Sequence, residues 1–318
     1  MIGTINLDLI VNEIRRDLEV RLEKFGLFYR VFARGKSLDS INHKLALKKG
    51  VYGEWKKMQD IVGIRVVLYF VDDVAIVYDI LRSMPNYLEE SNSEKDIREL
   101  DKTLGEDIKK RIGNLADKLF MPERLNLVFR MSDTQTDSLS MALSGLDFAN
   151  LVDNTFEVQI RTVFSEGWHE VEHDLRYKCQ GDPTWEYCRE ESRTLNGMYA
   201  SLEIVESAMR GLFDDMAFKN FKHQDWASMM RNKYCIRFED NKLSDRVIEC
   251  LSENGGYIGK VLYKYSREEL FSLIKRLPRK LPRKMDNIVF LINRFTVNNE
   301  SIRLLEPTPI SDLLDTIS

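Results

Sequence analysis

Charged and apolar side chains alternate along residues 155–162, TFEVQIRT. A period of two along a strand places Glu157, Gln159 and Arg161 on one face and the apolar residues on the other. The next residues, EGWHEVEHD, have helical spacing and add further charges. This pattern indicates a strand whose polar face binds a charged ligand, with a solvated charged face as the alternative.

A second polar group falls at the start of an apolar run, in DIVGIRVV. Asp60 precedes the run, Gly63 allows close approach by another group, and Arg65 needs a partner or a ligand because it is embedded among apolar residues. A carboxylate at a strand edge suits Mg²⁺, which takes one or two carboxylates and completes its shell with phosphate and water. Together with Asp60, Glu157 makes a pair of carboxylates suited to phosphoryl transfer. An internal salt bridge between Asp60 and Arg65 is the alternative.

A third group of polar residues lies in RGKSLDSINHK. It places four candidate anion-binding residues at a strand end and along the first turns of the next helix: Arg34, Lys36, Ser40 and Lys44. Basic side chains near a helix N-terminus oppose the helix dipole unless an anion joins them. A polyphosphate would supply that anion, and a solvated basic face is the alternative.

These groups must be positioned by a mixture of strands and helices. Apolar periodicity predicts an α+β fold with two domains, residues 1–220 and residues 221–318, the second a smaller α/β domain. In the first domain we expect helices at 7–25, 40–47, 71–84, 88–123 and 163–218, and strands at 28–34, 61–70, 125–131 and 156–162. The strand at 61–70 reads as buried on both faces, because it is almost continuously apolar. In the second domain KYCIRFE and DNIVFLINRF read as strands.

Composition is that of a globular protein, with 43% hydrophobic and 31% charged residues among 318. No run approaches the length of a membrane span, so we expect a cytoplasmic protein without membrane contact. The net charge of −4 divides into about +4 for residues 221–318 and about −8 for the rest.

The positive charge of the second part is concentrated in residues 275–284, KRLPRKLPRK. A tRNA or a protein partner could contact its six basic residues, which are Lys275, Arg276, Arg279, Lys280, Arg283 and Lys284. A solvated linker is the alternative. Whether the chain forms a homo-oligomer stays open at this stage.

The three polar motifs, RGKSLDSINHK, DIVGIRVV and FEVQIRT followed by EGWHEVEHDLRYK, resemble in this order the synthetase domain of RelA/SpoT-type alarmone synthetases. The resemblance implies a mixed-sheet, nucleotidyltransferase-like fold flanked by helices. It also implies transfer of pyrophosphate from ATP to the 3′-hydroxyl of a nucleotide, with release of AMP.

By this resemblance, Arg34 and Arg65 would sandwich the adenine of ATP. The ATP phosphates would be held by Lys36, Ser40 and Lys44. Asp60 and Glu157 would bind Mg²⁺, and Glu157 would also be the candidate base for the attacking hydroxyl. The candidate acceptor-side residues are Gln159, Arg161, Ser138 and His173.

The acceptor loop departs from the family, which usually has Gly-Tyr-Arg-Ser-Leu-His between the second and third motifs. The stretch that aligns here is TQTDSLSMAL, where Ser138 matches but Thr136, Asp137 and Ser140 replace the Tyr, Arg and His. Three hypotheses follow: a GDP or GTP acceptor giving (p)ppGpp, another acceptor such as an adenine nucleotide or the 3′ end of tRNA, or a non-catalytic ATP-binding module. The family's long members carry an N-terminal His-Asp hydrolase, which we expect to be absent, with His173 and Asp174 belonging to the closing helix.

Overall fold

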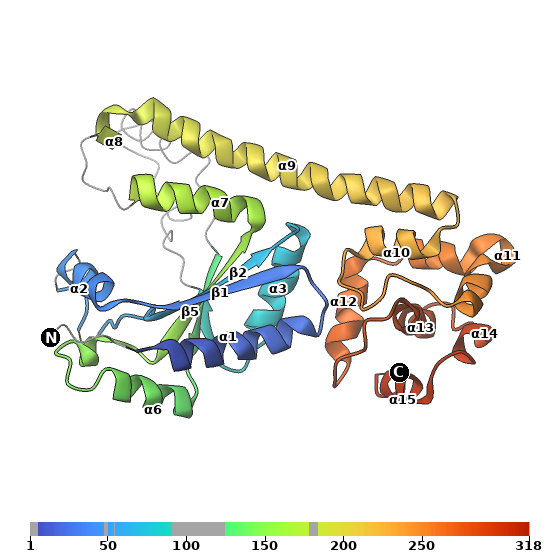
Figure 1. Cartoon of the computed structure of the whole chain (residues 1–318), viewed down its shortest axis with the longest axis horizontal. Coiled ribbons are helices and arrows are strands. Elements are labelled where there is room, and N and C mark those ends of the chain that lie inside the picture. The colour runs from blue at the N-terminus through green and yellow to red at the C-terminus, as the bar shows by residue number, and fades with distance from the viewer. Residues whose placement is uncertain (1–5, 48–49, 54, 91–124, 178–183, 318) are drawn as a thin grey trace, which may run out of the picture. The chain divides into compact units, whose positions relative to one another are not determined.

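A computed structural model describes residues 6–47, 50–53, 55–90, 125–177 and 184–317 (Figure 1). The chain divides into two compact units, one formed by residues 1–18 and 29–206 and the other by residues 19–28 and 207–318. The predicted domain boundary near residue 220 stays a prediction, since compactness does not show that either part folds alone. The helix predicted at 88–123 is wrong for residues 88–90, which belong to a strand, and the rest of that segment lies outside the described residues.

The first unit is built on a five-stranded mixed sheet with the order β1-β2-β5-β4-β3. Its strands are β1 (Tyr29–Gly35), β2 (Val62–Leu68), β3 (Tyr87–Glu90), β4 (Leu125–Arg130) and β5 (Thr155–Thr162). The central strands β2 and β5 are parallel, and every other pair is antiparallel. The prediction of an α+β fold with a mixed sheet is confirmed.

Helices cover both faces of this sheet. The described helices up to residue 222 are α1 (Asp8–Glu23), α2 (Leu38–Leu47), α3 (Asp72–Arg82), α6 (Asp133–Ala142), α7 (Val163–Glu172), α8 (Thr184–Tyr187) and α9 (Arg189–Lys222), with a 3-10 turn at Ala149–Leu151 and a π-helical turn at His173–Tyr177. Figure 1 shows α7 on one side of the sheet and α1 and α6 on the other. Helix α1 forms because Ile10, Ile14 and Leu18 recur at i, i+4 and i+8 and are all buried.

The side of the sheet that α1 covers can be read from Gly35, at the end of β1. A Cβ on Gly35 would lie 2.7 Å from the Cβ of Leu7, just before α1. Helix α6 joins the same side, since Gln135 Nε2 donates to Glu13 Oε1 of α1 at 3.5 Å. Residues that alternate with Gly35, such as Arg34, therefore face away from α1 and α6.

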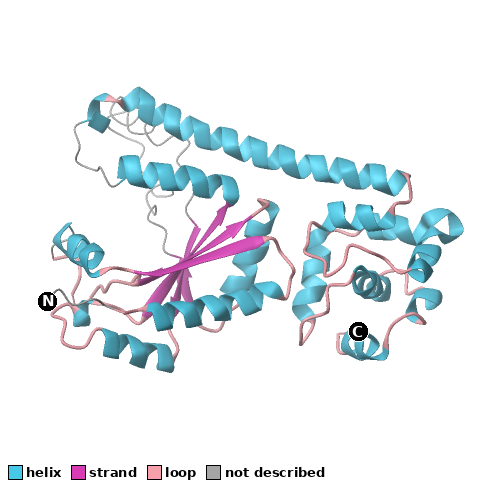
Figure 2. Cartoon of the chain, viewed as in Figure 1, coloured by secondary structure: helices cyan, strands magenta, loops and turns pink. Residues whose placement is uncertain are grey.

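The second unit is helical, which corrects the prediction of a C-terminal α/β domain. Beyond the end of α9, its described residues form α10 (Trp226–Tyr234), α11 (Asp245–Lys264), α12 (Arg267–Arg276), α13 (Met285–Phe295), α14 (Glu300–Arg303) and α15 (Thr308–Asp315), and Figure 2 shows only helices and loops there. DNIVFLINRF belongs to α13, in which nearly every residue is buried. Its centre, residues 288–292, is a continuous apolar run that is equally typical of a buried strand, so this run alone could not separate the two.

KYCIRFE was also wrong as a strand. Helix α10 ends at Tyr234, and Cys235 then adopts the left-handed conformation with φ of 44°. In the described part of the chain, no helix is both long and apolar enough to cross a membrane.

Candidate active site on the polar face of the sheet

The polar residues of β5 lie on one face of the strand, as the alternation predicts. Phe156, Val158 and Ile160 are buried, while Glu157 and Gln159 are half-buried on the opposite face. This face continues across the sheet because paired residues of neighbouring strands share a face.

The strand register aligns these residues in rows. In one row Gly63 lies between Arg34 of β1 and Glu157 of β5. In the next row Arg65 lies between Phe32 and Gln159. Gly63 and Arg65, on the polar face of β2, are only partly buried. The prediction that this strand is buried on both faces is therefore wrong at these two residues.

Asp60 is held by two lysines where the chain enters β2. Lys44 Nζ of α2 lies 2.6 Å from Asp60 Oδ2, and Lys36 forms an ion pair with the same oxygen. Lys36 is fixed there because its backbone N–H donates to Ile61 O at 2.9 Å and its Nζ donates to Asp60 O at 2.9 Å. The structure thus brings together three of the residues that the sequence singled out.

The two carboxyls of the predicted pair have opposite electrostatic surroundings. Burial opposes ionisation of Asp60, but Lys36 and Lys44 outweigh it, so the pKa of Asp60 lies below its ordinary value. Burial raises the pKa of Glu157, and the charge of Asp60 raises it further. Burial lowers the pKa of Lys36, because it disfavours the charged form of the amine. Burial acts on Lys44 in the same direction, but the charge of Asp60 outweighs it and the pKa of Lys44 is raised.

The donor set fits a divalent cation that binds together with a polyphosphate. Asp60 Oδ1 is buried and has no hydrogen-bond partner among the described residues, so one carboxylate oxygen is available to a ligand. Among those residues no cluster of three or more His, Cys, Asp or Glu could hold a metal alone. Asp60 and Glu157 would therefore hold Mg²⁺ only with phosphate oxygens and water completing its shell.

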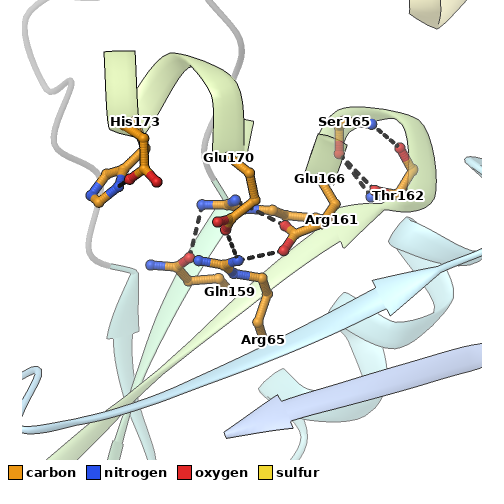
Figure 3. Close-up of polar contacts among 9 residues, drawn as sticks. Arg65, Gln159, Arg161, Thr162, Ser165, Glu166, Glu170 and His173 are labelled. Atoms are coloured by element: carbon orange, nitrogen blue, oxygen red, sulfur yellow. Dashed lines mark hydrogen bonds and ion pairs between the residues drawn. The ribbon is translucent and has the colours of Figure 1, made fainter. Parts of the chain in front are cut away.

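Arg65 is engaged by helix α7, which lies over the same face (Figure 3). Its guanidinium forms ion pairs with Glu166 and Glu170. Glu166 also accepts from Arg161 Nη1 at 2.9 Å, and Arg161 Nη2 donates to Gln159 Oε1 at 2.9 Å. The alternative of an Asp60 to Arg65 salt bridge is therefore wrong, because each of these residues has other partners.

Helix α7 is positioned by its own N-terminus. Thr162, the last residue of β5, caps the helix by accepting from Ser165 N at 3.1 Å, and Ser165 Oγ accepts from Thr162 N at 2.9 Å. The buried Glu206 of α9 contacts the Thr162 hydroxyl. A capping box of this kind fixes where the helix starts, and so fixes Glu166 one turn later over the sheet.

Other candidate residues are placed less centrally. Ser40 is exposed in the first turn of α2, where its Oγ lies 2.8 Å from Ser37 Oγ. His173 follows α7, with its Nδ1 3.2 Å from Asp174 Oδ1 (Figure 3).

Ser138 is not brought together with the polar face. It lies on α6, the helix that contacts α1, and its hydroxyl donates to Thr134 O at 2.9 Å. Ser140 Oγ donates in the same way to Thr136 O. The stretch aligned with the family's acceptor loop is thus a helix, with a capping box between Ser132 and Gln135.

Three residues of the site had no role in the sequence analysis. Glu166 and Glu170 were noted only for their spacing, although i and i+4 carboxylates on a helix that follows an arginine-bearing strand are a usable signal. Tyr52 was missed entirely: its ring lies 5.9 Å from Lys44 Nζ, and its hydroxyl helps to raise the pKa of Lys44. Tyr52 lies in a bend of the chain rather than in a helix or strand, so no hydrophobic periodicity pointed to it.

The fold and this face together define an α+β domain with a site suited to a polyphosphate and a divalent cation. A family model described as a region found in RelA/SpoT proteins matches residues 33–182, and this stretch is therefore a RelA/SpoT-type domain. The match spans all three polar motifs. The sequence has no match among curated proteins.

Several solved structures are similar to the chain. Small alarmone synthetase 1 from Bacillus subtilis is 21% identical with a TM-score of 0.43, covering 64% of this chain and 92% of that one. A GTP pyrophosphokinase family protein from Streptococcus pneumoniae is 22% identical with a TM-score of 0.42, covering 64% and 89%. Small alarmone synthetase 2 from Bacillus subtilis is 19% identical with a TM-score of 0.40, covering 65% and 94%.

Proposed function

We propose that the protein is an ATP-dependent pyrophosphotransferase that moves pyrophosphate from ATP to the 3′-hydroxyl of a nucleotide, with GDP or GTP as the first acceptor to test. The RelA/SpoT-type domain at residues 33–182 supports this reaction class. The observation that carries it is the placement of Asp60 beside Lys36 and Lys44, with Glu157 on the neighbouring strand.

In this reaction the 3′-hydroxyl oxygen of the acceptor attacks the β-phosphorus of ATP. The bond from that phosphorus to the oxygen it shares with the α-phosphate breaks, and its electron pair leaves with AMP. Glu157 takes the hydroxyl proton, because it is the other carboxylate of the polar face and lies on the strand that pairs with β2, which Asp60 precedes. Mg²⁺ bound by Asp60 and Glu157 would neutralise charge on the phosphates.

In this proposal Lys36 and Lys44 bind the phosphate groups of ATP, both the pyrophosphate that is transferred and the α-phosphate that leaves with AMP. Both lysines form ion pairs with Asp60. A polyphosphate entering with its own cation would offer them further oxygens, and their positive charge would stabilise the charge that builds up on the leaving oxygen. Arg34 is exposed on the same face, and in this proposal it would meet the nucleoside part of the donor.

The acceptor is the open part of this proposal. Gln159 and Arg161 lie on the polar face and hydrogen-bond to each other, whereas α6 supplies no aromatic ring to stack on a guanine. Stacking of a base on an aromatic ring contributes about 1–3 kcal/mol. An acceptor other than guanosine, such as an adenine nucleotide or the 3′ end of tRNA, is therefore the second candidate.

The test is to incubate the purified protein with γ-labelled ATP, Mg²⁺ and one acceptor at a time: GDP, GTP, ADP, ATP or bulk tRNA. We expect label to move to one acceptor class, and that class names the product. Absence of labelled product with all five, while ATP still binds, would favour a non-catalytic ATP-binding module.

We also propose that part of the basic segment 275–284 contacts an anionic partner. Its members differ in the structure. Arg283 Nε donates to Arg237 O at 2.8 Å, Lys280 lies 3.5 Å from Glu23, and Arg276 donates to Ile317 O, so these three hold their own unit together. Arg279 and Lys284 are exposed, and they are the residues best placed to meet a partner.

A further inference from the structure

Phe32 is an aromatic residue on the polar face of the sheet. It lies in β1, an edge strand, between Arg30 and Arg34, and its side chain is 52% exposed. Single exposed apolar side chains are common on protein surfaces, so exposure alone has no functional meaning. What distinguishes Phe32 is its position among the residues of the candidate active site.

The register of β1 and β2 places Phe32 at one corner of a square. Phe32 is paired with Arg65, and Arg34, two residues along β1, is paired with Gly63. Side chains at paired positions of an antiparallel ladder lie about 5 Å apart at Cβ. The Gly63 corner has no side chain, and a Cβ there would meet no described atom within 4 Å. The four corners are thus Phe32, Arg65, Arg34 and Gly63, with open space above the glycine.

The guanidinium of Arg65 is fixed at this square by the carboxylates of α7. Glu166 and Glu170 contact the same nitrogen, Nη1, at the edge of the guanidinium. An arginine bound at its edge keeps the flat faces of its guanidinium for stacking. Phe32 and Arg65 therefore offer adjacent planar surfaces of the kind that bind nucleobases.

The distance to the phosphate-binding lysines suits one nucleotide. Lys36 follows Phe32 by four residues, which at about 3.3 Å per residue corresponds to roughly 13 Å along the chain. Arg34 lies between them on the same face. A base, a ribose and a chain of phosphates can cover such a span.

We propose that Phe32 stacks on the purine base of the donor nucleotide. The inference rests on the proposed function, because it takes the ligand of this face to be ATP with its phosphates at Lys36 and Lys44. It gives one face of the purine to the ring of Phe32, so only one guanidinium of the Arg34 and Arg65 pair implied by the family resemblance can take the other face. Since stacking uses the π-face that every base has, Phe32 adds affinity with little selectivity among bases.

The test measures binding of two ligands in the presence of Mg²⁺ and without an acceptor: ATP, and inorganic tripolyphosphate, which has no base. We expect Phe32→Ala to weaken ATP binding between about fivefold and a hundredfold. Tripolyphosphate binding should stay within twofold of wild type, because Lys36 and Lys44 are unchanged. Phe32→Trp should retain ATP affinity, and Phe32→Leu, which keeps an apolar side chain without a ring, should lose it as Ala does.

Leu9→Ala is the matched control, because Leu9 is an exposed apolar residue of α1, on the other side of the sheet, and its loss should leave both affinities unchanged. ATP binding by Phe32→Ala and Phe32→Leu within twofold of wild type would overturn the inference. Equal losses for ATP and tripolyphosphate would also overturn it, since they would indicate a general change of the site. If the wild type binds ATP but transfers no label, the proposed function fails while the stacking result still decides the role of Phe32.

Discussion

Lys44 Nζ lies 2.6 Å from Asp60 Oδ2, while the other carboxylate oxygen of Asp60 is buried and has no hydrogen-bond partner among the described residues. The site therefore offers a cation one negative oxygen whose charge is already partly balanced by lysines. Both lysines can turn to phosphate oxygens when a nucleotide brings its own charge. This arrangement links the stability of the free protein to the same residues that would bind the substrate.

Replacement of Asp60 by Asn should destabilise the protein by about 1–2 kcal/mol at pH 7, because two partly buried lysines lose their counter-ion. The pKa of Asp60 is lowered in the folded state, so its contribution to stability is complete above the ordinary Asp pKa of 3.8 and is lost as the pH falls through the lowered value. Urea unfolding of both proteins between pH 3 and pH 7 measures this difference. A difference that does not shrink toward low pH would contradict the ion-pair assignment.

Replacement of Glu157 by Gln should have the opposite effect on stability. Burial raises the pKa of Glu157, so its contribution to stability is complete below the ordinary Glu pKa of 4.5 and is lost as the pH rises through the raised value. The Gln variant should be at least as stable as wild type at pH 7 and should lose pyrophosphate transfer. Thermal unfolding at pH 7 and the transfer assay check both parts, and a clearly less stable variant would show that Glu157 has an ionic partner in the folded state.

Glu166 and Glu170 should differ in their effects on stability, although both contact Arg65. Glu166 is mostly buried and also binds Arg161, so Glu166→Gln should cost about 1–2 kcal/mol and weaken ATP binding by loosening Arg65. More than half of the Glu170 side chain is exposed, so Glu170→Gln should cost less than about 0.5 kcal/mol. Unfolding and ATP titration of both variants give the comparison, and equal costs would contradict it.

Gly63 should tolerate a side chain in the fold but not in the site. A Cβ at this position meets no described atom, and Ala in a strand is favoured over Gly by about 0.5–1 kcal/mol. We therefore expect Gly63→Ala to be slightly more stable than wild type, and Gly63→Val to bind ATP at least tenfold more weakly. Unimpaired ATP binding by the Val variant would place the nucleotide elsewhere on the sheet.

The basic segment can be tested with two exposed residues. Arg279→Gln combined with Lys284→Gln should reduce tRNA retention at low salt. The dependence of the tRNA binding constant on salt concentration should also become less steep, by the equivalent of about two phosphate contacts. Stability should be unchanged, whereas the control Arg283→Gln should lose stability because Arg283 donates to Arg237 O. Unchanged tRNA retention by the double variant would contradict the proposal and would show that the basic segment serves only to stabilise the second unit.

The alternation along β5 could be predicted from the sequence, because it is a short-range pattern, and the structure places Glu157 and Gln159 on one face. The sequence also singled out Lys36, Lys44 and Asp60, which the structure brings into contact, while their roles stay a prediction. The partners of Arg65 could not be predicted in the same way, because they depend on the parallel register of β2 and β5 and on the placement of α7.

Long apolar runs were the other source of error. The run in α13 was taken for a strand because its centre, residues 288–292, is continuously apolar, while the polar residues that mark the helical period lie only at its two ends. The stretch at residues 133–142 was matched to a loop by two residues, although the Ser132 to Gln135 capping box marks a helix start. A capping box is a local sequence signal for the start of a helix, and here it predicts the structure better than the alignment of two residues does.

The most direct test of the proposed reaction is the fate of the α-phosphate of ATP. With α-labelled ATP, Mg²⁺ and the acceptor found above, the account predicts labelled AMP in a one-to-one ratio with the pyrophosphorylated product, and no AMP from Glu157→Gln. Labelled ADP in place of AMP would show transfer of a single phosphate and would contradict the account, as would AMP formation that persists in the Glu157→Gln variant.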